Sequence, residues 1–261
     1  AIIGRFGNRI ANASFSIDDE VFQIENNEGE NSLHSGNNGF HNVIWDVNII
    51  EDSIEPKVQL SYVSEDGEGG FPGTLRTEVY YSLTKENELK IEYKATTDKA
   101  TIVNLTHHSY YNLSGNFSQE ILDHVIQING QKIVEVDEKC IPTGNLRSVS
   151  QTPFNFTNPK LLGSDINALD EQLQFTNGYD HTWVLDGKGF RSIAQVYHEA
   201  SGRLMEVFTD QPGVQFYTGN SLSNQNHGKH NDCIGKRTGL CLETQHYPDS
   251  PNQPSFPTVV L

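Results

Sequence analysis

The sequence predicts an all-β protein made of antiparallel sheet, with at most one or two short helices. Residues 58–63 and 89–95 alternate apolar and polar side chains, as half-buried strands do. The stretch 75–83 is a third strand, which pairs with 89–95 through the short polar connection 85–88. Apolar runs spaced by Gly, Asn and Asp favour hairpins over the crossovers of a parallel sheet.

Two further pairs of strand-like segments complete this pattern. Asn129-Gly130 is the preferred dipeptide of a type I′ turn and predicts a hairpin between 125–128 and 133–136. A second hairpin is expected from 193–198, a turn at 200–202 and 204–208. A short helix is expected within Pro159–Leu173, where the leucines and Ile166 lie near helical spacing.

Length and charge narrow the classes of protein that are possible. The 261 residues show no break in composition and no repeat, so one domain spanning 1–261 is expected. A net charge of −16 argues against nucleic acid and anionic membranes as partners, and no apolar run of about 18 residues is present. Three scattered cysteines indicate reduced thiols, so we expect a cytoplasmic protein.

A single carboxylate lies inside an otherwise uncharged strand near the end of the chain. In the segment 239–245, Cys241, Glu243 and Gln245 share one face of the expected strand and the leucines share the other. An edge strand with a solvated face explains this pattern as well as a catalytic site does. The catalytic alternative is a buried Glu243 that acts as a general base.

Paired histidines lie in a second polar segment, 102–113. A strand turns His107 and His108 to opposite faces, so only one of them can enter a given site. No His-x-His or His-x-x-x-His spacing supports a metal. A core or surface histidine is the ordinary alternative.

Three other segments combine amides, carboxylates and cations. Gln215 shares a strand face with an aromatic residue, which is typical of a sugar site but also of a half-exposed strand. Asp180 follows an Asn-Gly turn, and Arg9 is a cation that can orient a polyol or pair with a carboxylate. None of these segments is decisive alone.

Taken together and in order, the segments resemble the aldose 1-epimerase (galactose mutarotase) family. The matching strings are GRFGNRIA at 4–11, NSLH at 31–34, FPG at 71–73, NLTHHSYYNL at 104–113, IPTG at 141–144, NGYDH at 177–181, QPGVQFYTGN at 211–220, LETQ at 242–245 and NQPSFP at 252–257.

The resemblance implies a large antiparallel β-sandwich of the galactose mutarotase type. It also implies interconversion of the α and β anomers of free hexoses, with no metal or other cofactor and a small sugar as partner. By position, Glu243 matches the general base of the family and His108 its general acid, on opposite sides of the sugar. The matching sugar-binding groups are Asn8, Arg9, His34, Asp180 and Gln215, with Ser109 and Tyr110 beside them.

The chain departs from the family pattern at several points. His107 stands where the family commonly has Asn, and Gly7 replaces a common Ala. The family pattern runs past both ends, and the terminal runs Ala1-Ile2-Ile3 and Val259-Val260-Leu261 are apolar. We therefore expect further strands before Ala1 and after Leu261, since bare apolar edges invite pairing with other chains.

Two other functions remain open. A hexose-6-phosphate 1-epimerase of the same superfamily would need a cluster of Arg or Lys for the phosphate, whereas the motifs offer Arg9 and little else. A non-catalytic sugar-binding protein would have no reason to keep both Glu243 and His108. The sequence leaves the preferred hexose and the oligomeric state undetermined.

Overall fold

The structure is a computed structural model that describes residues 1–51, 54–223, 226–228 and 233–261. The chain divides into two compact units. Unit 1 comprises Thr106–Pro257 together with Ala1, and unit 2 comprises Ile2–Leu105 together with Thr258–Leu261. Among the described residues, no helix is long and apolar enough to cross a membrane.

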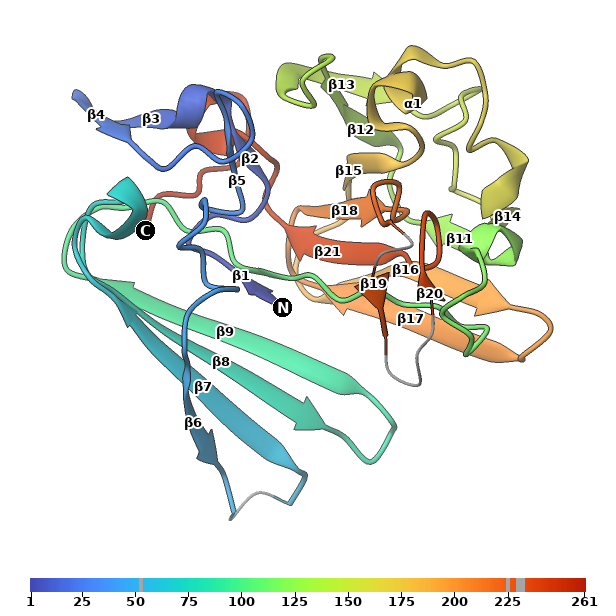
Figure 1. Cartoon of the computed structure of the whole chain (residues 1–261), viewed down its shortest axis with the longest axis horizontal. Coiled ribbons are helices and arrows are strands. Elements are labelled where there is room, and N and C mark those ends of the chain that lie inside the picture. Colours follow the sequence, from blue (N-terminus) through green and yellow to red (C-terminus); the bar gives the residue numbers. More distant parts are fainter. Residues whose placement is uncertain (52–53, 224–225, 229–232) are drawn as a thin grey trace. The chain divides into compact units, whose positions relative to one another are not determined.

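Unit 1 is a sandwich of two antiparallel sheets (Figure 1). The first sheet has the strand order β14 (Lys160–Leu161), β11 (Val125–Ile128), β16 (Arg191–His198) and β17 (Arg203–Thr209). The second has the order β13 (Pro142–Ser148), β12 (Lys132–Val136), β15 (Asp180–Val184), β18 (Gly213–Tyr217) and β21 (Cys241–Gln245). Short strands β10 (Thr106–His107), β19 (Asn226–His227) and β20 (Cys233–Ile234) complete the unit.

A common apolar core explains why these two sheets pack together. Ile126 and Ile193 come from the first sheet, whereas Trp183, Val214 and Phe216 come from the second, and all five are fully buried in one cluster. Alternation within β18 turns Val214 and Phe216 into this core and leaves Gln215 and Tyr217 on the opposite face. The predicted face assignment of this strand is therefore confirmed.

Unit 2 contains a four-stranded antiparallel sheet and several short elements. The sheet runs in the order β6 (Asp46–Ile49), β7 (Lys57–Ser64), β8 (Leu75–Leu83) and β9 (Leu89–Thr97). The pair Leu83 and Leu89 closes the β8–β9 hairpin, which confirms the pairing predicted from the sequence. The remaining strands are β1 (Ile2–Ile3), the pair β2 (Arg9–Ile10) and β5 (Ser32–Leu33), and the hairpin of β3 (Ser14–Ile17) with β4 (Glu20–Gln23).

The hairpin predicted at Asn129-Gly130 is wrong. β11 pairs with β14 and β16, whereas β12 pairs with β13 and β15, so the chain passes from one sheet to the other at this dipeptide. Neither Asn129 nor Gly130 has the positive φ that a type I′ turn requires. A Cβ on Gly130 would lie 2.6 Å from the Val184 carbonyl oxygen, so the glycine allows two backbones to approach closely.

The prediction of a helix within Pro159–Leu173 is also wrong in its position. Residues 160–161 form β14, and Leu162–Ser164 form a 3₁₀ turn. The α-helix of the described residues, α1, is Glu171–Thr176, and it begins where the Asp170 carboxylate accepts the Gln172 N–H. The described residues also form 3₁₀ turns at Ala11–Ala13, Glu68–Gly70, Ile121–Asp123 and Ser250–Asn252.

The second predicted hairpin is confirmed, because β16 pairs with β17 from Arg191 with Thr209 to His198 with Arg203.

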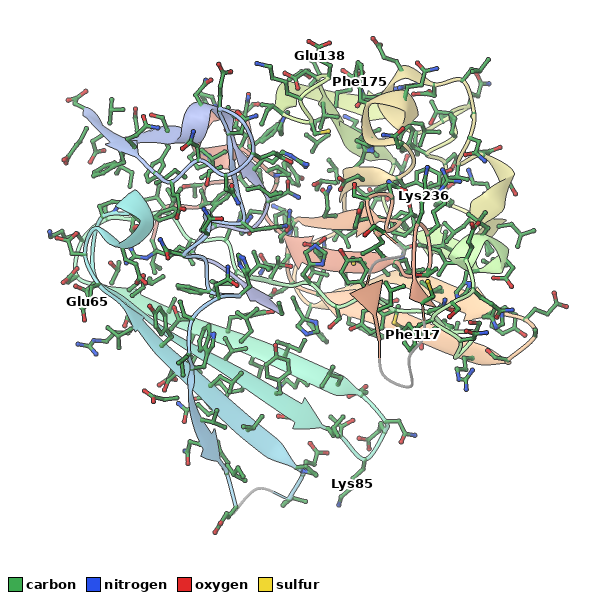
Figure 2. All side chains as sticks on the ribbon, in the orientation of Figure 1. Glu65, Lys85, Phe117, Glu138, Phe175 and Lys236 are labelled. Atoms are coloured by element: carbon green, nitrogen blue, oxygen red, sulfur yellow. The ribbon has the colours of Figure 1, made fainter. Side chains whose placement is uncertain are left out.

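Charged residues in several loops lie on the surface. Glu65, Lys85 and Glu138 are exposed and project from their loops into solvent (Figure 2). The excess of negative charge is thus carried in part by loop side chains.

Candidate active site

Three adjacent strands of unit 1 place the predicted polar residues on one face of the second sheet. The registers of β15, β18 and β21 set Gln215 directly opposite Thr182 on one side and Glu243 on the other. Side chains at directly opposite positions share a face of the sheet. One row across three strands therefore carries a hydroxyl, an amide and a carboxylate.

Glu243 is buried although its strand lies at the edge of the sheet. β21 is the last strand in the order, yet Glu243 is 2 % exposed, and Leu242 on the opposite face joins the apolar core. The alternative of a solvated edge strand is thereby excluded.

Cys241 lies on the same face of β21 as Glu243. Burial raises the pKa of the Cys241 thiol well above its usual range, and the negative charges of Glu243 and Asp180 raise it further. Cys241 is thus protonated at neutral pH and is no nucleophile.

The segment that carries His108 runs along β21. The Thr106 hydroxyl donates to the Thr244 carbonyl oxygen over 3.0 Å, and Tyr111 and Leu240 exchange backbone hydrogen bonds of 2.8 and 2.9 Å. Between these anchors, His108 Nε2 lies 3.5 Å from Glu243 Oε1. The predicted acid and the predicted base are thus neighbours in unit 1.

His107 has different surroundings from those of His108. The continuous strand expected here is wrong, because β10 contains only Thr106–His107 before the backbone becomes irregular. His107 Nε2 lies 3.1 Å from the Ser109 Oγ, so Ser109 contacts the other histidine rather than the acid. Burial lowers the pKa of His107 to about 4, and repulsion from a cationic His108 acts in the same direction. His107 is therefore neutral at physiological pH and holds no proton to donate as an imidazolium.

Two tyrosines enclose the His108 ring. Tyr110 stacks on it with ring centroids 5.2 Å apart and an interplanar angle of 30°, and Tyr217 presents an edge at 6.4 Å. Burial is the main cause that raises the pKa values of both phenols, so neither ionises near neutral pH. Tyr217 lies on the same face of β18 as Gln215. Its contact with His108 could not be predicted from the sequence alone.

Asp180 and Gln215 contact each other directly. Gln215 Nε2 donates to Asp180 Oδ1 over 2.6 Å. The backbone that enters Asp180 is fixed by the end of α1, where Asn177 takes the left-handed conformation, and by the Asn220 amide, which donates to the Thr176 and Tyr179 carbonyl oxygens. The predicted Asn-Gly turn is thus the end of a helix. His108, Asp180, Gln215 and Glu243 together are called the unit 1 cluster below.

The remaining three predicted residues lie together in unit 2. The Asn8 N–H donates to His34 Nδ1 over 3.0 Å, and the His34 N–H donates back to the Asn8 carbonyl oxygen. This bond places the proton of a neutral His34 on Nε2. Asn8, His34 and Ser35 all have positive φ, which is rare outside glycine and is often found at functional sites.

Arg9 pairs with the carboxylate of Glu28, which belongs to none of the motifs in the sequence. Its Nε and Nη2 donate to the two oxygens of Glu28 over 2.7 and 2.9 Å, a bidentate arrangement that fixes the plane of the guanidinium. Glu28 lies nineteen residues away in a polar loop rich in Glu and Asn, and nothing in that composition singles it out.

Outside the unit 1 cluster, Asp123, His124 and His198 bring possible metal-ligand atoms within 4.8 Å of one another. His124 Nδ1 and His198 Nε2 lie 2.9 and 3.1 Å from the two oxygens of Asp123. The Leu113 N–H donates to His124 Nε2, so the His124 proton resides on Nδ1, the atom that would have to bind the metal. These hydrogen bonds favour a structural role for the three residues, which fix the Leu113 backbone, rather than metal binding.

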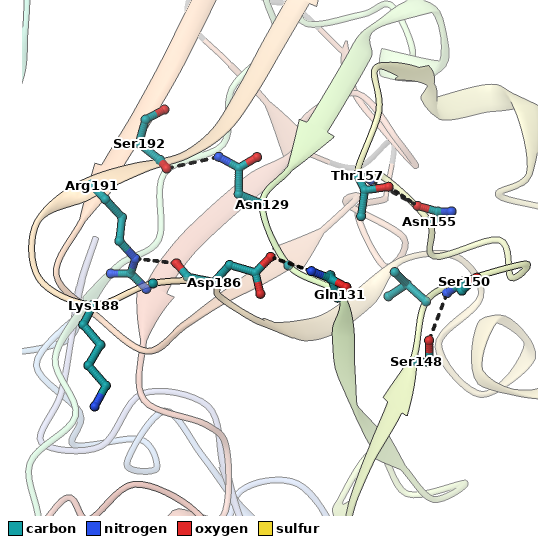
Figure 3. Close-up of a pocket in the computed structure, with 13 residues that line it drawn as sticks. Asn129, Gln131, Ser148, Ser150, Asn155, Thr157, Asp186, Lys188, Arg191 and Ser192 are labelled. Carbon is teal, nitrogen blue, oxygen red and sulfur yellow. Dashed lines mark hydrogen bonds between the residues drawn. The ribbon is translucent and has the colours of Figure 1, made fainter.

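A cavity of about 790 Å³ opens elsewhere on unit 1. Its walls come from the β11–β12 corner, the end of β13 and the β15–β16 loop (Figure 3). Residues that line the cavity form hydrogen bonds with one another. For example, the Asn129 amide donates to the Ser192 carbonyl oxygen, and the Arg191 guanidinium donates to the Asp186 carbonyl oxygen. Among the described residues, those that line this cavity include no predicted site residue and no aromatic side chain. The residues of the unit 1 cluster therefore lie outside it.

Three buried or half-buried histidines allow a prediction of how stability depends on pH. Burial lowers the pKa values of His107, His124 and His246 below the 6.5 of an exposed imidazole. As the pH falls below about 6.5, the unfolded chain binds protons that the folded chain does not, so the free energy of unfolding decreases, and for His107 this continues to a pH of about 4. We expect urea midpoints to fall steadily between pH 7 and pH 4.5, with a weaker dependence in His107→Asn. An identical pH dependence in the two proteins would contradict the assignment to His107.

Comparison with known proteins gives a consistent result. The family model described as aldose 1-epimerase matches residues 1–261. Galactose mutarotase of Bos taurus is 44% identical over 262 residues, covering 100% of this chain and 74% of the relative. Aldose 1-epimerase of Escherichia coli K12 is 38% identical over 259 residues, covering 98% and 73%.

A solved structure agrees with these relatives. The GalM/aldose epimerase homologue from C. elegans matches with a TM-score of 0.89 and 30% identity, covering 100% of this chain and 77% of that one. This match confirms the predicted β-sandwich fold of the galactose mutarotase type. From the family model and the identity to curated relatives, we conclude that the chain belongs to the aldose 1-epimerase family.

Proposed function

We propose that the chain is an isomerase that interconverts the α and β anomers of free hexoses such as D-glucose and D-galactose. The observation that carries this proposal is the distance of 3.5 Å between His108 Nε2 and Glu243 Oε1 in a buried part of unit 1. The names of the relatives, galactose mutarotase and aldose 1-epimerase, support the same reaction.

The chemistry needs two proton transfers at atoms bonded to one carbon. Glu243 takes the proton of the C1 hydroxyl while His108 donates a proton to the ring oxygen, so that the C1–O5 bond breaks and an aldehyde forms. Rotation about C1–C2 presents the other carbonyl face, and the two residues exchange roles as the ring closes. Because both oxygens are attached to C1, an acid and a base 3.5 Å apart suit the reaction. That the two residues act from opposite sides of the sugar stays a prediction.

The neighbouring polar groups are the proposed sugar-binding residues. In unit 1, Asp180 and Gln215 accept from and donate to sugar hydroxyls, Tyr110 supplies an apolar face, and Ser109 acts through His107. Asn8, Arg9 and His34 remain sugar-binding residues on the strength of the family resemblance.

The two alternatives lack support from the contacts. A hexose-6-phosphate requires cations for its phosphate, but the Arg9 guanidinium already holds both oxygens of Glu28. A non-catalytic sugar-binding protein needs no buried carboxylate beside an imidazole, and burying a charge is costly.

Polarimetry on freshly dissolved sugars tests the proposal. We expect the protein to speed the approach of α-D-glucose and α-D-galactose to anomeric equilibrium, and we expect dialysis against EDTA to leave the rate unchanged, because the proposed acid and base are side chains. A hexose 6-phosphate serves as the comparison substrate. Preference for the phosphate, or loss of activity with EDTA that added metal restores, would contradict the proposal.

A further inference from the structure

The Gln215 amide in β18 is held at both of its ends. Its Nε2 donates to Asp180 Oδ1, and its Oε1 accepts a hydrogen bond from the Thr182 hydroxyl. A carboxylate only accepts hydrogen bonds, so the amide nitrogen rather than the amide oxygen must face Asp180. The direction of both bonds is therefore fixed: hydroxyl to amide oxygen, and amide nitrogen to carboxylate.

The sheet explains why Thr182 can reach this amide. Thr182 and Gln215 are directly opposite in the β15–β18 register, and Asp180 lies two residues before Thr182 on the same face. Thr182 and Gln215 are 2 % and 3 % exposed. A Cβ on Gly213 would lie 2.8 Å from the Thr182 Cγ2, so the glycine leaves room for the methyl group and the threonine is closely packed.

We propose that Thr182 is a positioning residue for sugar binding, which holds the Gln215 amide so that its nitrogen faces Asp180 and the substrate. This inference rests on the proposed function. Among the described residues, the second Nε2 hydrogen of Gln215 has no acceptor. Held in this way, Gln215 offers a sugar an N–H donor, while the Asp180 carboxylate offers only acceptors. The pair therefore suits a sugar in which one hydroxyl accepts a hydrogen bond from Gln215 and a neighbouring hydroxyl donates one to Asp180.

Removing the hydroxyl should loosen this arrangement without touching the acid or the base. In Thr182→Val, which keeps the branched shape, the buried Oε1 loses its partner and the amide can turn or withdraw from Asp180. We expect KM for the preferred hexose to rise about tenfold, which corresponds to about 1.4 kcal/mol of binding, and kcat to change less than about twofold. Thr182→Ser restores a hydroxyl and should keep KM within about threefold of the wild type.

A buried threonine outside the cluster provides the control. Thr209 of β17 is also buried, and its hydroxyl oxygen accepts the Gln211 N–H. Thr209→Val should lower stability like any loss of a buried hydrogen bond, with KM unchanged. A merely structural role for Thr182 would make the two valine variants alike, and serine would not rescue KM.

Side-chain amide NMR tests the contact without reference to activity. The Gln215 Nε2 resonance, assigned by its loss in Gln215→Glu, should move in Thr182→Val and in Thr182→Ala but stay in place in Thr182→Ser. If the valine variant does not fold, the alanine variant carries the same test. An unmoved resonance or an unchanged KM would overturn the proposal. If the wild type shows no mutarotation at all, the proposed function fails, whereas the NMR result still decides the Thr182–Gln215 contact.

Discussion

Replacing Glu243 by Gln is expected to leave a folded protein with almost no mutarotase activity. The amide has nearly the shape of the carboxylate but cannot take the C1 hydroxyl proton, and a general base of this kind typically contributes about 10²–10⁴-fold. Since the side chain is 2 % exposed and lies 3.5 Å from His108 Nε2, water is a poor substitute for it. The measurement is kcat by polarimetry, together with thermal unfolding followed by circular dichroism.

Glu206 offers a matched control for this substitution. It is also a strand carboxylate, in β17, but it is exposed and accepts a hydrogen bond from the Gln195 amide. Glu206→Gln should keep full activity. If Glu243→Gln kept more than about a tenth of the wild-type kcat, a loss below about 1.4 kcal/mol, the assignment of the base would be wrong.

His108→Ala is expected to be far more damaging than His107→Ala. His108 is the histidine within 3.5 Å of Glu243, whereas His107 contacts Ser109 and has a pKa of about 4. Loss of a general acid should lower kcat by about 10²–10⁴-fold. We expect the His107 variant to keep kcat within about threefold of the wild type, since the loss of a group outside the proton transfers costs little.

Polarimetry on the two alanine variants, after their unfolding transitions are shown to be similar, makes this comparison. Equal losses in two well-folded proteins would mean that His107 shares the proton transfer or holds His108 in place. A smaller loss in His108→Ala than in His107→Ala would reverse the assignment of the acid.

Local sequence patterns predicted those parts of the fold that local interactions determine. The β8–β9 and β16–β17 hairpins join segments that are close in the chain, and period-two alternation fixes which side chains face the core. The same alternation placed Gln215 on the polar face of β18. Here the strand and its turn are specified within about twenty residues.

The sheet change at Asn129-Gly130 could not be predicted in this way. The dipeptide is compatible with a tight turn, but β11 and β12 do not pair with each other. β11 pairs with β14 and β16, and β12 pairs with β13 and β15, so all of their partners come from segments that follow later in the chain. The close approach of Gly130 to the Val184 carbonyl explains the glycine only once both sheets are present. Local turn preference was overridden by packing between distant segments.

In the candidate site too, some residues could be predicted from sequence motifs and others could be identified only from the folded structure. The residues in the matching strings were named from the sequence, whereas Glu28 and Thr182 were not. Each is identified only by a side-chain contact in the folded protein, with Arg9 in one case and with Gln215 in the other. Such roles depend on register and side-chain direction, which a single sequence does not contain.

The row formed by Thr182, Gln215 and Glu243 also bears on how the chain folds. No hairpin creates it, because the chain leaves β15 to form β16 and β17 in the opposite sheet before it returns as β18, and the long connection from Tyr217 to Cys241 follows. Pairings between segments so far apart must overcome loop-closure entropy before they gain any contacts, which makes them slow steps. This row, which carries the proposed base Glu243, can therefore exist only in molecules whose distant strands have already paired, so we expect the return of activity during refolding to be a late event, after local hairpins have formed.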